Sequence, residues 1–173
     1  MNISQPFCHV LVGLPGVGKS TWCNMNVAGR TIPYRIVSTD NIIEAHAARQ
    51  GKTYDQVFKD YIKIAQLEYE GQLSSYLAAG ANILVDRTNL SVKSRKSILD
   101  KVPDHYIKTA IVFTCKEDTQ EGRLTSRKGK YIPDFVIKSM KDNYQVPTFN
   151  EGFDDIIFID TDKTISDLER LGL

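Results

Sequence analysis

The sequence is poor in the residues that form cross-links and metal sites. Its 173 residues include only three cysteines and three histidines. Cys8, Cys23 and Cys115 lie far apart and lack the spacing of a zinc site, and the histidines are equally scattered. We therefore expect no disulfide-linked partner and no histidine metal site. This cysteine usage is typical of a reduced, intracellular protein.

The sequence also lacks a long apolar run and a large excess of either charge. No stretch is long enough to span a bilayer and none has the pattern of a secretory signal, so we expect a cytoplasmic protein without membrane contacts. The net charge of +1 disfavours extensive, salt-dependent electrostatic binding to duplex nucleic acid. Basic residues are nevertheless concentrated between Arg123 and Lys130, a segment without acids, and such a local cluster suits phosphate chemistry.

The most informative stretch is Gly13–Ser20, which fits the phosphate-binding pattern of Gly, four residues and Gly-Lys-Ser. A mostly apolar run at 7–12, typical of a buried strand, precedes it, and the residues after it can continue as a helix. Strand, glycine-rich turn and helix N-terminus together form an anion site. Lys19 is predicted to reach the β- and γ-phosphates, and Ser20 to ligate Mg²⁺. The predicted contacts to ATP are Gly13, Gly16, Val17, Gly18, Lys19, Ser20 and Thr21.

Strand and helix patterns alternate along the rest of the chain. Short apolar runs at 34–38, 83–85, 106–114 and 156–159 predict further strands. Helical patterns follow at 42–50, 53–80, 91–101, 117–127, 133–144 and 164–171. This alternation predicts an α/β fold, the three-layer P-loop NTPase fold, with a five-stranded parallel sheet covered by helices on both faces. Because no linker or repeat interrupts it, residues 1–173 are predicted to form a single domain.

The longest predicted helix, 53–80, begins with the capping box Thr53-x-x-Gln56 and ends at Gly80. Its apolar residues recur at helical spacing, namely Phe58, Ile62, Ala65, Tyr69, Leu73 and Tyr76. We expect the aromatic members of this stripe to lie in the core and not to form a platform for stacking bases.

Polar clusters follow two predicted strands, at the edge where ligands of open parallel sheets gather. Asp40 follows the strand at 34–38, close to where the γ-phosphate would lie, and a carboxylate there can accept a proton from an attacking hydroxyl. Its alternative role is to cap the following helix. Asp86 follows the strand at 83–85, where it could hold Mg²⁺ through water or orient the acceptor. Its alternative role is again to cap a helix. Asp40 could also hold Mg²⁺ through water. Thr88 and Asn89 either shape the loop or donate to a substrate phosphate.

Arg123 and Arg127 are four residues apart and are predicted to share one face of the helix at 117–127. In P-loop kinases a mobile lid lies at this point of the chain, and we place it at about residues 116–132. An arginine there would neutralise charge on the transferring phosphoryl group, and lid closure would exclude water. The alternative is an ordinary solvated basic surface.

These clusters resemble the kinase domain of the polynucleotide 5′-hydroxyl kinases found in phage and in animal end-repair enzymes. Residues 13–22 resemble that family's phosphate loop, and Asp86 with Thr88-Asn89-Leu90 resembles its Asp-Thr-Asn segment, with Arg87 inserted. The resemblance implies that Asp40 is the general base, that Asp86 helps to position the acceptor, and that the lid arginines are catalytic. It also implies that the segment 146–153 lies beside the nucleotide. The phage enzyme has an arginine that binds a substrate phosphate where this chain has Ile43.

The resemblance implies an ATP- and Mg²⁺-dependent kinase whose acceptor is the 5′-OH end of DNA or RNA. The residues predicted to contact that substrate are Asp40, Asp86, Arg87, Thr88 and Asn89. Ile43 and the near-zero net charge favour the alternative of a nucleoside or sugar-nucleotide kinase. A nucleotide-dependent switch is disfavoured, because the sequence has no guanine-recognition motif. We expect no phosphatase domain.

Overall fold

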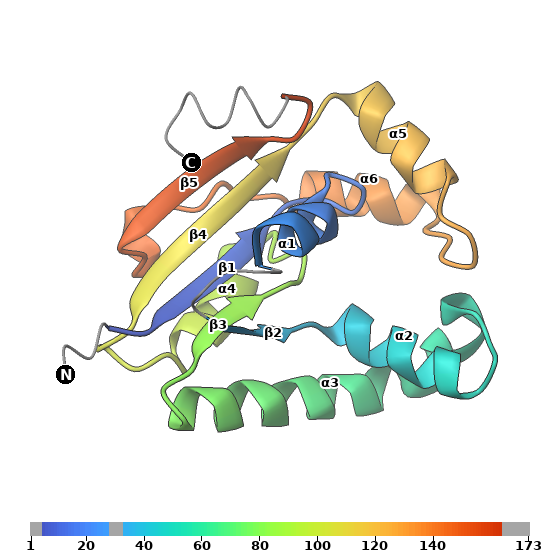
Figure 1. Ribbon diagram of the computed structural model, residues 1–173. Helices are drawn as coiled ribbons and strands as arrows, with labels where there is room; N and C mark the ends of the chain where they lie inside the picture. Colours follow the sequence, from blue (N-terminus) through green and yellow to red (C-terminus); the bar gives the residue numbers. More distant parts are fainter. Residues whose placement is uncertain (1–4, 28–32, 164–173) are drawn as a thin grey trace.

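In the computed structural model, which describes residues 5–27 and 33–163, five parallel strands form one sheet (Figure 1). They are β1 (Phe7–Val12), β2 (Tyr34–Val37), β3 (Asn82–Val85), β4 (Ile107–Thr114) and β5 (Asp155–Asp160). Their order across the sheet is β2-β3-β1-β4-β5, and each neighbouring pair is parallel. The predicted α/β fold with a five-stranded parallel sheet is therefore confirmed. Because all strands run the same way, their carboxyl ends share one edge.

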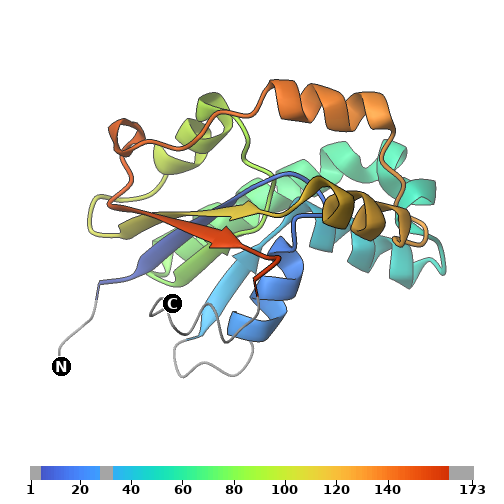
Figure 2. The ribbon, with the colours of Figure 1, turned by 90° about the horizontal axis from the view of Figure 1, so that it is seen from above.

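Six α-helices connect or flank these strands within the described residues. They are α1 (Lys19–Val27), α2 (Thr39–Arg49), α3 (Tyr54–Ala78), α4 (Val92–Leu99), α5 (Glu117–Thr125) and α6 (Asp134–Asp142), with a 3₁₀ turn at Phe149–Glu151. Viewed along the sheet in Figure 2, α1 lies on one face while α4 and α6 lie on the other. The helix predicted at 164–171 lies outside the described residues.

Helix boundaries follow the capping chemistry of the sequence. The Ser91 side chain accepts from the Ser94 N–H and begins α4, as predicted, and Gln56 Oε1 accepts from the Thr53 N–H at 2.8 Å at the start of α3. By contrast, α2 begins three residues before its predicted start at Ile42, because Ser38 accepts from the Asn41 N–H and is the cap.

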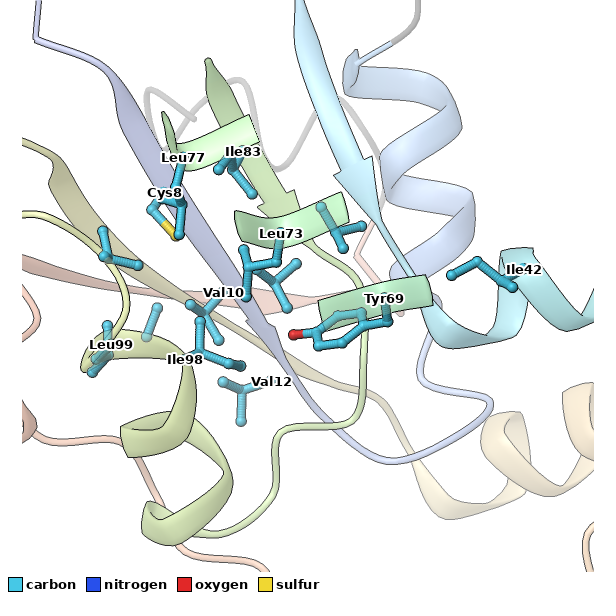
Figure 3. Packing of buried hydrophobic residues seen from close by; sticks show 14 of the residues in the cluster. Cys8, Val10, Val12, Ile42, Tyr69, Leu73, Leu77, Ile83, Ile98 and Leu99 are labelled. Carbon is cyan, nitrogen blue, oxygen red and sulfur yellow. The ribbon is translucent and has the colours of Figure 1, made fainter. Parts of the chain in front are cut away.

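Hydrophobic cores form on both faces of the sheet. On the larger side, α3 and α4 pack against β1 and β3, and Figure 3 shows Tyr69, Leu73 and Leu77 of α3 beside this surface. On the other side, Cys23 of α1 and Phe113 of β4 belong to a smaller cluster. None of the described helices is both long enough and apolar enough to cross a membrane.

One prediction about α3 is wrong. Phe58 is 40% exposed, whereas its neighbour Val57 is 4% exposed and belongs to the core. The buried residues Val57, Ala65 and Tyr69 are spaced by multiples of four and share one side of α3, so Phe58, next to Val57, lies about 100° away around the helix. It stacks on Tyr54 instead, with ring centroids 5.4 Å apart.

The segment 146–153, which the resemblance placed beside the nucleotide, begins near the loop after β3, because the Gln145 N–H donates to the Leu90 carbonyl at 2.8 Å. Its position relative to a nucleotide stays a prediction. The segment leads into the amino end of β5, opposite the edge that carries the phosphate loop (Figure 1). Glu151 forms a buried, bidentate ion pair with Arg95 of α4, at 2.7 and 2.8 Å. Phe153 is buried in the larger core. Glu151 and Phe153 of this segment therefore stabilise the fold.

Candidate active site

The turn between β1 and α1 has the backbone of a phosphate-binding loop. Gly16 and Gly18 have φ angles of 83° and 96°, which non-glycine residues rarely adopt. A Cβ on Gly18 would lie 3.2 Å from both Arg123 Nη1 and Thr161 Oγ1. The loop is also fixed from behind, since the Gly13 N–H donates to the Thr88 carbonyl at 3.0 Å. These glycines give the loop its backbone conformation and let it pack closely against α5 and Thr161.

Lys19 lies at the first position of α1 with its ammonium turned back over the loop. Its Nζ donates to the carbonyl oxygens of Gly13 and Leu14, at 2.8 and 2.9 Å. Burial lowers the pKa of Lys19 to about 8, partly opposed by the nearby charge of Asp86. A poorly hydrated cation held at this point is suited to binding phosphate oxygens.

The remaining predicted ATP contacts differ in what they can offer. Ser20 and Thr21 are exposed in the first turn of α1, so their hydroxyls are accessible. Val17 is 5% exposed and its side chain packs in the smaller core, so it can offer only its backbone. A hydroxyl at the start of this helix, with carboxylates nearby on the same edge, is a donor set that fits Mg²⁺.

Asp40 lies in the first turn of α2 at the same edge of the sheet. Because Ser38 is the cap, the alternative role of Asp40 as the helix cap is ruled out. Its Oδ1 accepts from the Tyr54 hydroxyl and its Oδ2 from Lys130 Nζ, both at 2.8 Å. Partial burial would raise the pKa of Asp40, but the charge and hydrogen bond of Lys130, together with Tyr54 and Arg127, outweigh it and lower the pKa. The carboxylate is therefore ionised at neutral pH.

Asp86 follows β3, and Asp40 lies at the start of the helix that follows the neighbouring strand β2. Burial raises the pKa of Asp86, and the negative charge of Asp40 adds to this effect. The positive charge of Lys19 acts in the opposite direction but does not cancel the rise. Lys19, Asp40 and Asp86 thus influence one another electrostatically, as expected for groups around a single site. The guanidinium of Arg87, the next residue, lies over the Tyr69 ring at 4.7 Å.

Thr88 and Asn89 hold the loop after β3 against β1. The Asn89 amide donates to the Leu11 carbonyl at 2.8 Å, and the residue is 4% exposed with a φ of 47°. Asparagine tolerates this left-handed conformation better than most residues. These contacts agree with the loop-shaping interpretation. The Thr88 side chain lines an open cleft of ≈ 230 Å³ together with Arg87 and Ser139.

Helix α5, in the predicted lid region, rests on the phosphate loop. Gln120 Nε2 donates to the Pro15 carbonyl at 2.8 Å. Arg123 Nη1 donates to Thr161 Oγ1 at 2.9 Å and lies 3.4 Å from the Gly16 carbonyl oxygen. The Thr161 hydroxyl in turn donates to the Val17 carbonyl at 2.8 Å. Arg123 therefore links α5, the phosphate loop and the end of β5.

Arg127 does not share a helix face with Arg123, so that prediction is wrong. Helix α5 ends at Thr125 with Ser126 as its C-cap, and Arg127 lies in the loop that follows. Its positive charge lowers the pKa values of Lys19 and Asp40. Lys130, in the same loop, pairs with Asp40 and Glu44, both at 2.8 Å.

A family model described as "AAA domain" matches residues 8–147, which span the phosphate loop, both carboxylates and the lid region. The chain belongs to this AAA domain family. Its fold is that of P-loop kinases.

Individual relatives of this AAA domain protein include kinases with different acceptors. It is 24% identical to the bifunctional polynucleotide phosphatase/kinase of Schizosaccharomyces pombe over 85% of its own length and 32% of that protein. A chain of the Pnkp1/Rnl/Hen1 RNA repair complex superposes with a TM-score of 0.63, at 20% identity, covering 82% of this chain and 45% of that one. A sugar kinase from Janibacter sp. HTCC2649 gives 0.62 at 15% identity, covering 97% and 92%. The chain thus spans about a third of the length of the curated relative.

The site includes residues that sequence reasoning missed. Tyr54 and Lys130 hold Asp40, while Gln120 and Thr161 support the phosphate loop. Lys130 belongs to the basic segment recognised in the sequence, but nothing in the sequence pairs it with a residue 90 positions away. Ile43, by contrast, is fully buried in the core, so it does not contact an acceptor.

Proposed function

We propose that this protein transfers the γ-phosphoryl group of ATP to the 5′-OH end of a polynucleotide. The observation that supports the phosphoryl-transfer part is the placement of Lys19, Asp40 and Asp86 after the carboxyl ends of the three adjacent strands β1, β2 and β3. The similarity to a polynucleotide phosphatase/kinase over 85% of the chain supports the choice of acceptor.

In the proposed reaction, Asp40 accepts the proton of the acceptor hydroxyl while the oxygen of that hydroxyl forms a bond to the γ-phosphorus. The bond between that phosphorus and the bridging oxygen breaks, and ADP leaves. Lys19 and the loop N–H groups bind the phosphate oxygens, and Arg127 neutralises charge on the transferring group. Mg²⁺, when bound, would spread the charge of the triphosphate, and Ser20 with Asp86 through water would hold it.

A second acceptor class is a sugar or nucleoside. Ile43 is buried where the phage enzyme has a phosphate-binding arginine, so this chain offers one cation fewer to a nucleic-acid strand. The fold match to a sugar kinase over 92% of that chain agrees with a small acceptor.

The decisive experiment offers γ-labelled ATP and Mg²⁺ with a panel of 5′-OH DNA and RNA oligonucleotides, nucleosides and sugars. Oligonucleotides that already carry a 5′-phosphate are the matched control. We expect label on the 5′-OH oligonucleotides and none on the controls. Label on nucleosides or sugars alone would overturn the polynucleotide assignment while leaving the kinase assignment in place.

The role of Asp40 is tested in the same assay with Asp40→Asn, which keeps the size of the side chain but accepts a proton poorly. We expect kcat to fall by about 10²–10⁴-fold, the usual contribution of a general base, with little change in KM for ATP. Turnover equal to that of the unmodified protein would exclude Asp40 as the base.

A further inference from the structure

The two oxygens of Asp40 are each held by a donor from a different part of the chain. Tyr54, at the start of α3, donates its hydroxyl hydrogen to Oδ1, and Lys130 donates to Oδ2. A carboxylate held by only one donor can rotate about its last single bond. With donors on opposite oxygens, the plane of the Asp40 carboxylate is fixed.

Lys130 itself has little freedom. Its ammonium also pairs with Glu44 Oε1 at 2.8 Å and lies 4.2 Å from the centre of the Tyr54 ring. The Lys130 side chain is 16% exposed, whereas the Asp40 and Glu44 side chains are more than half exposed. The cation is thus the most enclosed member of the cluster, and its position decides where the carboxylates lie.

The backbone around Lys130 is anchored on both sides. We call residues 126–132, between α5 and α6, the lid loop. The Asp55 N–H donates to the Gly129 carbonyl at 3.1 Å, and the Tyr131 N–H donates to Asp55 Oδ2 at 2.9 Å. Gly129 has a φ of 71°, and a Cβ there would lie 2.9 Å from the Thr53 side chain. The lid loop therefore docks closely on the N-terminus of α3, as the proximity of these segments in Figure 2 also shows.

We propose that Lys130 and Tyr54 are positioning residues that hold Asp40 ready for the acceptor hydroxyl, and that Lys130 does so only while the lid loop is docked. The inference rests on the proposed function, in which Asp40 is the base. Each carboxylate oxygen has two acceptor sites, so one site on each remains open to the acceptor when Tyr54 and Lys130 are bound. Docking of the lid loop thereby couples closure over the phosphates to assembly of the base.

The test compares Lys130→Met, which removes the ammonium and keeps the chain length, with Lys128→Met, an exposed lysine of the same loop. We expect Lys130→Met to lower kcat by about 10- to 100-fold, because small misplacements of reacting groups have effects of this size, without changing KM for ATP. Lys130→Arg should recover most of the loss, and Tyr54→Phe should show a smaller loss of the same kind. Lys128→Met should behave as the unmodified protein.

A double-mutant cycle decides whether Lys130 acts through Asp40. In the Asp40→Asn background, Lys130→Met should lower kcat no further, since the group that it positions is gone. An equal loss in both backgrounds would overturn the proposal, as would a higher KM for the acceptor with an unchanged kcat. The second result would make Lys130 a substrate-binding residue.

One measurement needs no acceptor, so it separates this inference from the proposed function. Amide hydrogen exchange at Asp55 and Tyr131 reports docking of the lid loop, and it should be several-fold faster in Lys130→Met than in Lys128→Met. If exchange is faster in Lys130→Met but no acceptor is labelled by the unmodified protein, the role of Lys130 in docking the lid loop is supported and the proposed function is rejected. Unchanged exchange and unchanged kcat in Lys130→Met would reject the inference alone.

Discussion

The buried ion pair between Arg95 and Glu151 is predicted to be the most stabilising polar contact described in the structure. The Arg95 side chain is fully buried, and the Glu151 side chain is 4% exposed. Arg95 Nη1 also donates to the carbonyl oxygens of Asn89, Leu90 and Gln145, at 2.9 to 3.1 Å. The guanidinium therefore joins α4 to the loop after β3 and to the segment that enters β5.

Replacing Glu151 with Gln leaves the guanidinium buried without its counter-ion. Removing one partner of a buried ion pair lowers the free energy of unfolding by about 3–5 kcal/mol. We expect a loss of about 3 kcal/mol for Glu151→Gln, because the side-chain amide oxygen of glutamine can still accept one hydrogen bond. For a protein of this length, a loss of about 3 kcal/mol lowers Tm by about 6–12 °C. Arg95→Met should be more damaging, since three carbonyl oxygens, two of them buried, also lose a donor.

A matched control lies on the same helix. Lys96 and Asp100 form an ion pair with the same 2.7 Å separation, but their side chains are 66% and 59% exposed. Solvent screening reduces such a pair to about 0–1 kcal/mol, so Lys96→Met should hardly change the unfolding midpoint in urea or on heating. If Glu151→Gln proves no more destabilising than Lys96→Met, burial does not control the strength of this contact and the argument fails.

The same pair predicts a pH dependence. Burial alone would raise the pKa of Glu151, but the hydrogen bonds from Arg95 and the Thr148 N–H outweigh it and lower the pKa. A carboxyl whose pKa is lower in the folded state stabilises the protein above its unfolded pKa, and that stabilisation is lost as the pH falls through the folded value. The difference in unfolding free energy between the unmodified protein and Glu151→Gln should therefore be constant near neutral pH and shrink below about pH 4.

Two further predictions concern the phosphate site. Lys19→Ala should abolish phosphoryl transfer, because the ammonium is proposed to bind the phosphates. The far-UV circular dichroism should stay unchanged, because the ammonium is bonded only to loop carbonyls among the described contacts. Turnover in the folded variant would exclude this loop as the ATP site. Arg127→Ala and Arg123→Ala should both lower kcat, whereas Lys128→Ala should not. Only Arg123→Ala should also lower Tm, because Arg123 alone of the three is bonded to Thr161 and the phosphate loop. If all three variants have equally small effects on kcat, this segment is an ordinary solvated basic surface.

Local sequence determined the elements whose signals are short-range. The phosphate loop, the strand before it and the helix after it follow from glycines, an apolar run and a lysine within fifteen residues. Ser91 and the capping box at Thr53 were also predictable, because a cap depends on residues three positions apart. Alternation of strands and helices then fixed the parallel sheet, since parallel strands need crossovers.

Tertiary structure decided which polar residues meet. Asp40 follows β2 and Lys130 follows α5, and only the folding of the lid loop onto α3 brings them to 2.8 Å. The resemblance placed the segment around Glu151 beside the nucleotide, but nothing in the local sequence indicated that Glu151 pairs with Arg95, 56 positions away. Caps and loops depend on neighbouring residues, so the local sequence predicts them. Pairing across ninety positions depends on how the helices and strands pack, and no local sequence pattern indicates it.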